Sequence, residues 1–195
     1  ELANVWYNEP KSLDTAFGVI ADIVLSASGC QYGGFSFNSD LTLEPYAEKT
    51  YNNLIKKYLR LNLSKEQAEN EAWNDLERIA EQGFQEWEYK FNTLSSARGD
   101  FSFITAGFGL GKSKICRMLN KKIMEVRANG QGKKGNKKPV LFPKLVFLYD
   151  EELHGEGKEL EDVFNCAVEC NKKSMYPDYV SLSGPNYVSQ MYKKY

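Results

Sequence analysis

FITAGFGLGKSK (residues 103–114) joins a short run of apolar and β-branched residues to a segment with helical periodicity. A phosphate-binding loop follows the pattern G-x-x-x-x-G-K-[ST], and Gly111, Lys112 and Ser113 supply its last three positions. Ala106 stands where that pattern has its first glycine, and its Cβ removes backbone freedom that the loop needs. The stretch therefore leaves two hypotheses open: a nucleotide-binding loop, or a tight turn between a strand and a helix.

The segments around this stretch predict an α/β fold. Residues 100–109 and 143–150 are rich in aromatic and β-branched residues, and a helical pattern over 112–129 separates them. This strand–helix–strand order favours parallel pairing through a right-handed crossover. A helix over residues 158–176 and a strand over 177–184 continue the same alternation.

Helices dominate the chain before residue 94. Apolar periodicity predicts helices over residues 12–30, 43–61 and 63–94, with QYGGFSF as a link after the first. Ser64 and Gln67 form a capping box at the start of the third helix. The charged face of this long helix also leaves open a non-catalytic helical interaction module.

Composition excludes several classes of protein. The 195 residues carry a formal net charge of −1 and no long apolar run, so we expect no nucleic-acid partner, no membrane span and a cytoplasmic location. The four cysteines form no C-x-x-C pair and His154 is the single histidine, so no metal site is expected. Cys166 and Cys170 share a helix face and are expected in the core. The setting of His154 predicts an exposed loop.

Asp150, together with Gly111, Lys112 and Ser113, suggests an alternative function, a P-loop-like nucleotide-binding hydrolase. Asp150 ends an apolar strand and is followed by Glu151, the position of a magnesium-orienting acid in phosphate-transferring enzymes. The alternative is that Asp150 begins an ordinary loop. The lysine-rich connection over residues 127–139 likewise allows two interpretations, a phosphate-attracting loop or a solvated linker.

Five segments, taken together, resemble the anaerobic (class III) ribonucleoside-triphosphate reductases, which are glycyl-radical enzymes. They occur in the family's order and span nearly the whole chain. In that family the glycine-rich segment is a barrel turn, so Phe101, Phe103 and Ile104 are expected to fill the core. The matching segments are residues 10–37, 43–51, 94–111, 137–158 and 167–184.

The resemblance implies part of a ten-stranded α/β barrel preceded by long helices. Residues 1–93 would form a helical layer with the dimer and effector-site helices, and residues 94–195 the early strand–helix units of one continuous domain. The chain would be a fragment of an enzyme that reduces ribonucleoside triphosphates to deoxyribonucleotides by radical chemistry.

The resemblance also implies cofactors and partners of the parent protein, although none of the cofactors is bound by this fragment. They are a glycyl radical installed by an S-adenosylmethionine iron–sulfur activase, zinc in the C-terminal region, and formate as reductant. The partners are a ribonucleoside triphosphate substrate, deoxynucleoside triphosphate or ATP effectors, the radical-SAM activase and a second copy of the chain. The radical residues lie outside this segment, so we expect no catalytic residue within it.

Two groups of residues are candidates for nucleotide contacts. Asp22 and Ser26 share one helix face and, with Lys49, are expected to contact the effector; the alternative is that all three are solvated surface groups. Ser95, Ser96 and Arg98 are substrate-loop candidates, because an arginine grips phosphate through two hydrogen bonds. The alternative for this second group is a strand-entry loop whose serines cap the backbone.

Overall fold

A parallel sheet forms the centre of the computed structural model, which describes residues 8–30, 34–94 and 103–183. The strands pair in chain order, each parallel to the next, so the α/β prediction is confirmed. The strand that follows Phe103 lies beside the strand that contains Val146, as predicted. The strands are β1 (Phe35–Asn38), β2 (Ile104–Phe108), β3 (Lys144–Tyr149) and β4 (Asp178–Ser181).

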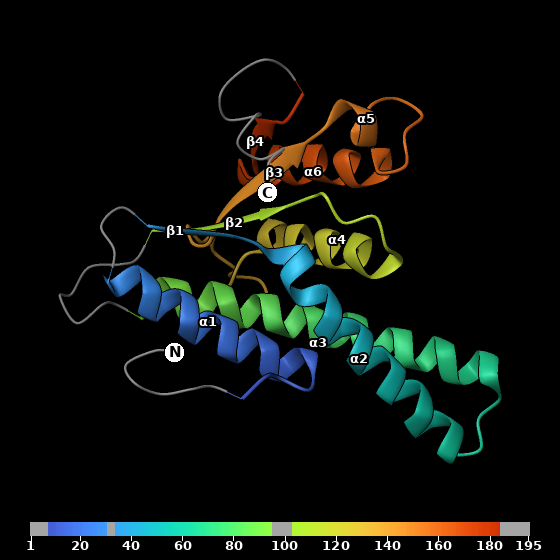
Figure 1. Ribbon diagram of the computed structural model, residues 1–195. Helices are drawn as coiled ribbons and strands as arrows, with labels where there is room; N and C mark the ends of the chain where they lie inside the picture. The colour runs from blue at the N-terminus through green and yellow to red at the C-terminus, as the bar shows by residue number, and fades with distance from the viewer. Residues whose placement is uncertain (1–7, 31–33, 95–102, 184–195) are drawn as a thin grey trace.

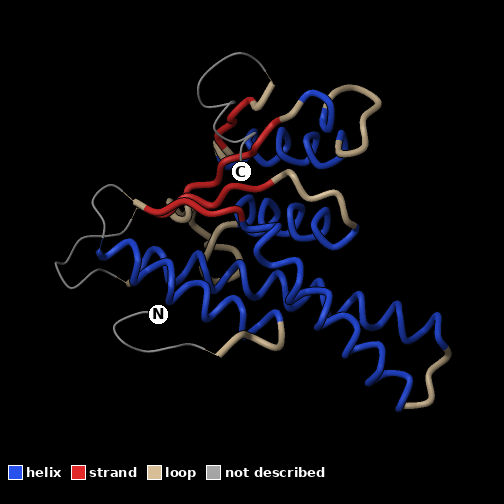
Figure 2. The backbone as a smooth tube through the Cα atoms, in the orientation of Figure 1, coloured by secondary structure: helices blue, strands red, loops and turns tan. Residues whose placement is uncertain are grey.

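The helices form two groups around this sheet (Figure 1). The first three pack on one another, and α2 and α3 make a long hairpin that extends beyond the strands. Figure 2 shows the four strands together as one group, with α4 and α6 beside them. In the described residues no helix combines the length and the apolar character that crossing a bilayer requires. The helices are α1 (Leu13–Cys30), α2 (Ser39–Arg60), α3 (Lys65–Thr93), α4 (Lys114–Asn129), α5 (Glu151–His154) and α6 (Glu161–Ser174).

Side chains alternate across the strands, so the sheet has an apolar face and a more polar one. Phe37, Ala106 and Leu145 stand in register on the apolar face, where Phe37 contacts Trp87 of α3 edge to face. The neighbouring row, which points the other way, contains Ser36 and Thr105. The helices therefore cover the face on which the strands carry their aromatic residues.

An aromatic cluster joins α1 to α3. Phe17 packs edge to face on Phe84 and Trp87, with ring centroids 5.0 and 4.8 Å away. The Trp87 indole donates a hydrogen bond of 2.8 Å to the carbonyl of Phe17, so this buried polar group is satisfied. These residues belong to the apolar stripes that the sequence predicted.

Local signals predicted the helices accurately where caps are present. α3 begins with the expected capping box, in which the Ser64 side chain accepts from the backbone of Gln67 and the Gln67 side chain accepts from Ser64. α2 begins at Ser39, one turn earlier than the predicted Leu43.

Two predictions around the first strands were wrong. The QYGGFSF segment was expected to be a link, yet its last residues form β1, a short strand held by pairing with β2. Phe103 was expected in the core but is 69% exposed, because it precedes β2 and contacts only the ring edge of Phe142 among the aromatic side chains described. Phe101 lies outside the described residues.

Candidate functional site

The glycine-rich turn after β2 holds a carboxylate of its own chain. Asp40, in the first turn of α2, is 1% exposed. Its Oδ2 accepts hydrogen bonds from the backbone N–H groups of Gly109 (3.1 Å) and Gly111 (2.9 Å) and from the Asn120 amide (3.2 Å). The donors that a phosphate-binding loop would offer to its ligand are therefore occupied from within.

The residues that resembled a phosphate-binding motif have structural roles here. A Cβ on Gly111 would lie 2.4 Å from the Cβ of Cys116, so glycine is required by close packing. The Ser113 hydroxyl caps α4 by accepting from the Cys116 backbone at 3.0 Å. Lys112 is exposed at the surface. The geometry thus favours the strand–helix turn over the nucleotide-binding loop.

His154 is buried, which corrects the prediction of an exposed loop. It is the last residue of the short helix α5, where it is 1% exposed and contacts the rings of Phe147 and Tyr149. Its Nε2 donates to the carbonyl of Gly109 at 2.8 Å, and its Nδ1 accepts from the backbone of Asp150 at 2.9 Å. Both ring nitrogens are thus used to join the loops that follow β2 and β3.

Asp150 behaves as the beginning of an ordinary loop. Its side chain accepts from the backbone of Glu152 at 3.0 Å and so caps α5. The backbone of Glu151 donates to the Ser183 hydroxyl at 2.8 Å, which ties this loop to the residues after β4. These bonds, with those of Asp40 and His154, link the chain segments that follow all four strands.

This linked edge is the carboxyl end of a parallel sheet, where α/β proteins commonly place their ligand sites. Within the part of the chain that the structure describes, no group of three histidine, cysteine or acidic side chains could hold a metal ion. Burial raises the pKa of the Cys116 thiol to about 12, and burial also raises that of Cys170. Both thiols are therefore protonated at neutral pH and serve as core residues.

Lys49 lines a polar hollow of about 880 Å³ between α2 and the segment before α1, which we call the α2 pocket. Its Nζ lies 2.8 Å from the Glu9 carboxylate, and this hydrogen bond lowers the pKa of Glu9 and raises that of Lys49. Three lysines and one glutamate give the pocket a surplus of positive charge. Its lining residues are Asn8, Glu9, Pro10, Lys11, Lys49, Asn52, Asn53 and Lys56.

The other predicted effector contacts lie elsewhere on α1. Asp22 and Ser26 are both exposed, and an Asp22 oxygen lies 3.7 Å from Lys90 Nζ of α3. Lys49 lies near the start of α1, because the neighbouring Thr50 accepts from the backbone of Leu13 at 2.7 Å. The rise of a helix puts Asp22 roughly 14 Å further along the axis. The structure does not bring these two residues together with Lys49.

Two lysines of the α2 pocket were not predicted. Lys49, Asn53 and Lys56 are spaced four and three positions apart, which places them on one face of α2 and is a usable signal. Lys11 joins them from the segment before α1, which no helical spacing could have shown. Ser95, Ser96 and Arg98, the substrate-loop candidates, lie outside the described residues.

A family model described as anaerobic ribonucleoside-triphosphate reductase matches residues 2–195 of the chain. The chain belongs to this reductase family. Among curated relatives, it is 36% identical over 183 residues to the anaerobic ribonucleoside-triphosphate reductase of Escherichia coli K12. It is 35% identical over 184 residues to the enzyme of the same name from enterobacteria phage T4.

These alignments cover 93% of the chain but only 25% of the Escherichia coli reductase and 30% of the phage reductase. The chain therefore spans only about a quarter to a third of the length of these relatives. Nothing in the comparisons supports the nucleotide hydrolase, and the occupied glycine turn agrees with the reductase assignment.

Proposed function

We propose that this chain is a segment of an enzyme that reduces ribonucleoside triphosphates to deoxyribonucleotides by radical chemistry. The family match over residues 2–195 carries this proposal. The parallel sheet supports it, since β1 to β4 are suited to be the early strands of a ten-stranded α/β barrel. In this proposal residues 1–93 supply the helical dimer and effector layer, and residues 94–195 continue the barrel wall.

The radical chemistry belongs to parts of the parent protein outside this chain. A glycyl radical, installed by an S-adenosylmethionine iron–sulfur activase, would supply the oxidising centre, with formate as reductant and zinc in the C-terminal region. The described residues would contribute the wall of the barrel and the hydrogen-bonded loops at its carboxyl edge. Arg98, with Ser95 and Ser96, remains our candidate for holding substrate phosphate.

The α2 pocket is our candidate for the effector site. Its three lysines can neutralise a triphosphate, and the amides of Asn52 and Asn53 can donate to and accept from a base. Lys49 forms an exposed ion pair with Glu9, so an incoming phosphate has to displace the Glu9 carboxylate. An ion pair this exposed to solvent is weak, which leaves the exchange favourable for a multiply charged ligand.

Asp22 and Ser26 do not line the α2 pocket. Both are on the exposed face of α1, so they would meet the effector only across the interface with a second copy of the chain. Asp22→Ala should then weaken effector binding in the dimer without changing the α2 pocket itself.

Calorimetric titration of the intact reductase with deoxynucleoside triphosphates and ATP tests the effector site. We expect Lys49→Ala and Lys56→Ala each to weaken deoxynucleotide binding by about tenfold, or about 1.4 kcal/mol. Lys112→Ala is the matched control and should leave binding unchanged, because Lys112 is exposed beside a turn that is already occupied. Loss of magnesium–ATP binding in Lys112→Ala alone would instead revive the hydrolase hypothesis.

A further inference from the structure

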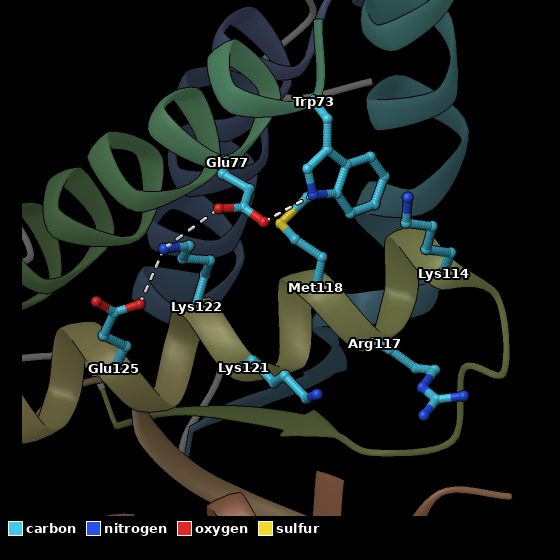
Figure 3. A pocket seen from close by; sticks show the side chains of 8 residues that line it. All are labelled: Trp73, Glu77, Lys114, Arg117, Met118, Lys121, Lys122 and Glu125. Carbon is cyan, nitrogen blue, oxygen red and sulfur yellow. Dashed lines mark hydrogen bonds and ion pairs between the residues drawn. The ribbon is translucent and has the colours of Figure 1, made fainter. Parts of the chain in front are cut away.

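A second hollow lies between α3 and α4 (Figure 3). It has a volume of about 530 Å³ and is walled by Trp73 and Glu77 of α3 and by one face of α4. We call it the α4 groove. Met118 provides an apolar floor beside the indole of Trp73.

One lysine of the groove is already neutralised. Lys122 Nζ lies 2.9 Å from a carboxylate oxygen of Glu125 and 3.9 Å from one of Glu77. Figure 3 shows it pointing to both acids at one end of the groove. Lys122 therefore has little charge left for a ligand.

The remaining cations are in excess over their acidic partners. Arg117 and Lys121 both bind the single carboxylate of Asp162 on α6, at 2.8 and 2.6 Å. Burial opposes the ionisation of Asp162, but hydrogen bonds from Lys121 and Arg117 outweigh it and lower the pKa of this carboxyl group. One carboxylate thus serves two cations.

Lys114 is the third cation of this row. Its ammonium group lies 3.9 Å from the centroid of the Trp73 ring, a cation–π contact, and no carboxylate of the described residues lies within ion-pair distance of it. Lys114, Arg117 and Lys121 recur at intervals of three and four residues, so they line one face of α4 over about 10 Å.

We propose that the α4 groove binds an oligophosphate chain, carried either by a nucleoside triphosphate or by inorganic polyphosphate. Lys114, Arg117 and Lys121 share the one carboxylate of Asp162, a local surplus of two positive charges. Lys122 with Glu77 and Glu125 takes away one of these, so the groove as a whole keeps a surplus of one positive charge. Phosphate oxygens suit this row, because guanidinium and ammonium groups bind them through charge-assisted hydrogen bonds. The α4 groove shares no lining residue with the α2 pocket.

Lysine acetylation of the intact protein, read out by mass spectrometry, locates the ligand. With tripolyphosphate present, Lys114 and Lys121 should be protected by about threefold or more, while the exposed Lys65 and Lys172 keep their reactivity. Protection by ATP but not by tripolyphosphate would assign the ligand to nucleotides; protection by both would assign it to the phosphate chain. Protection confined to Lys11, Lys49 and Lys56 would reject oligophosphate binding in the α4 groove and would support the α2 pocket as the effector site.

Charge variants provide the second test, by titration with tripolyphosphate. Lys114→Gln with Arg117→Gln should weaken binding by about tenfold, whereas Lys122→Gln, on the same helix, should change it by less than about twofold. Asp162→Asn should tighten binding by about twofold to fivefold, because it frees two cations from a competing carboxylate.

Thermal melting of each variant separates loss of binding from loss of folding. An equal loss in Lys122→Gln and in the double variant would show a diffuse positive field instead of a site, and would reject the proposal. Weaker binding in a fully folded Asp162→Asn protein would also reject it, since the carboxylate would then be organising the site.

Discussion

At the scale of single residues, Asp40 illustrates how one buried carboxylate can decide what a loop does. Its Oδ2 satisfies the turn donors of Gly109 and Gly111 and the amide of Asn120. A buried charge is tolerated only when such hydrogen bonds replace its lost hydration. The same bonds make the turn unavailable to a phosphate group, so Asp40 supports the structure at the position where the sequence resembled a nucleotide site.

Replacing Asp40 should therefore be costly. In Asp40→Ala, three buried donors lose their acceptor, and we expect the free energy of unfolding to fall by about 3–5 kcal/mol. Urea denaturation followed by circular dichroism measures this change. Glu156→Ala removes an exposed acid and is the control, with an expected change within about 0.5 kcal/mol. A small effect in Asp40→Ala would mean that water replaces the carboxylate, and that the turn is open to anions after all.

At the scale of elements, the packing of α1 on α3 depends on a glycine. An added Cβ on Gly83 would lie 2.1 Å from the ring of Phe17, so α3 can approach α1 closely only with glycine at this position. Gly18, on α1, has its nearest neighbour at 4.0 Å and no such constraint. Close packing therefore requires glycine at position 83 but not at position 18, although both residues lie inside helices.

This contrast predicts stability changes of opposite sign. Gly83→Ala should lower the free energy of unfolding by about 1–3 kcal/mol, because the aromatic cluster has to shift to admit a methyl group. Gly18→Ala should raise it by about 0.5–1 kcal/mol through the helix propensity of alanine. Paired denaturation curves check both values. Stabilisation by Gly83→Ala would contradict the close packing of Phe17 against α3.

At the scale of the whole molecule, the described sheet is open. β1 and β4 each have one strand neighbour among the described residues, although both belong to a parallel sheet. Parallel sheets normally have both faces covered, and exposed strand edges can pair with other chains. Phe103, Leu141 and Met175 add exposed apolar surface to this part of the molecule.

We therefore expect the isolated 195-residue chain to associate. Sedimentation velocity should show a weight-average mass that rises with concentration, while the intact reductase reaches one defined oligomer. A chain that sediments as a sharp monomer at all concentrations would contradict the open-edge description. Glu156→Ala serves as the control, because it removes an exposed charge without altering a strand edge and should not change association.

Much of this protein was determined by short-range patterns in the sequence. The α3 capping box involves residues three positions apart, and the apolar stripes of α1 and α3 repeat along single helices. Short stretches of sequence were therefore enough to predict these helices. The alternation of strands and helices after residue 94 and the family resemblance were also legible without coordinates.

The tertiary structure decided the remainder, because the interactions there join residues far apart in the chain. Asp40 and Gly109 are separated by 69 positions, and His154 and Gly109 by 45, so no local pattern could reveal that the turn is filled or that the histidine is buried. β1 is a four-residue strand held by a distant partner, and Lys11 meets Lys49 only because α1 folds back on α2. Periodicity reports which face of an element is apolar, whereas a site depends on which distant elements that face brings together.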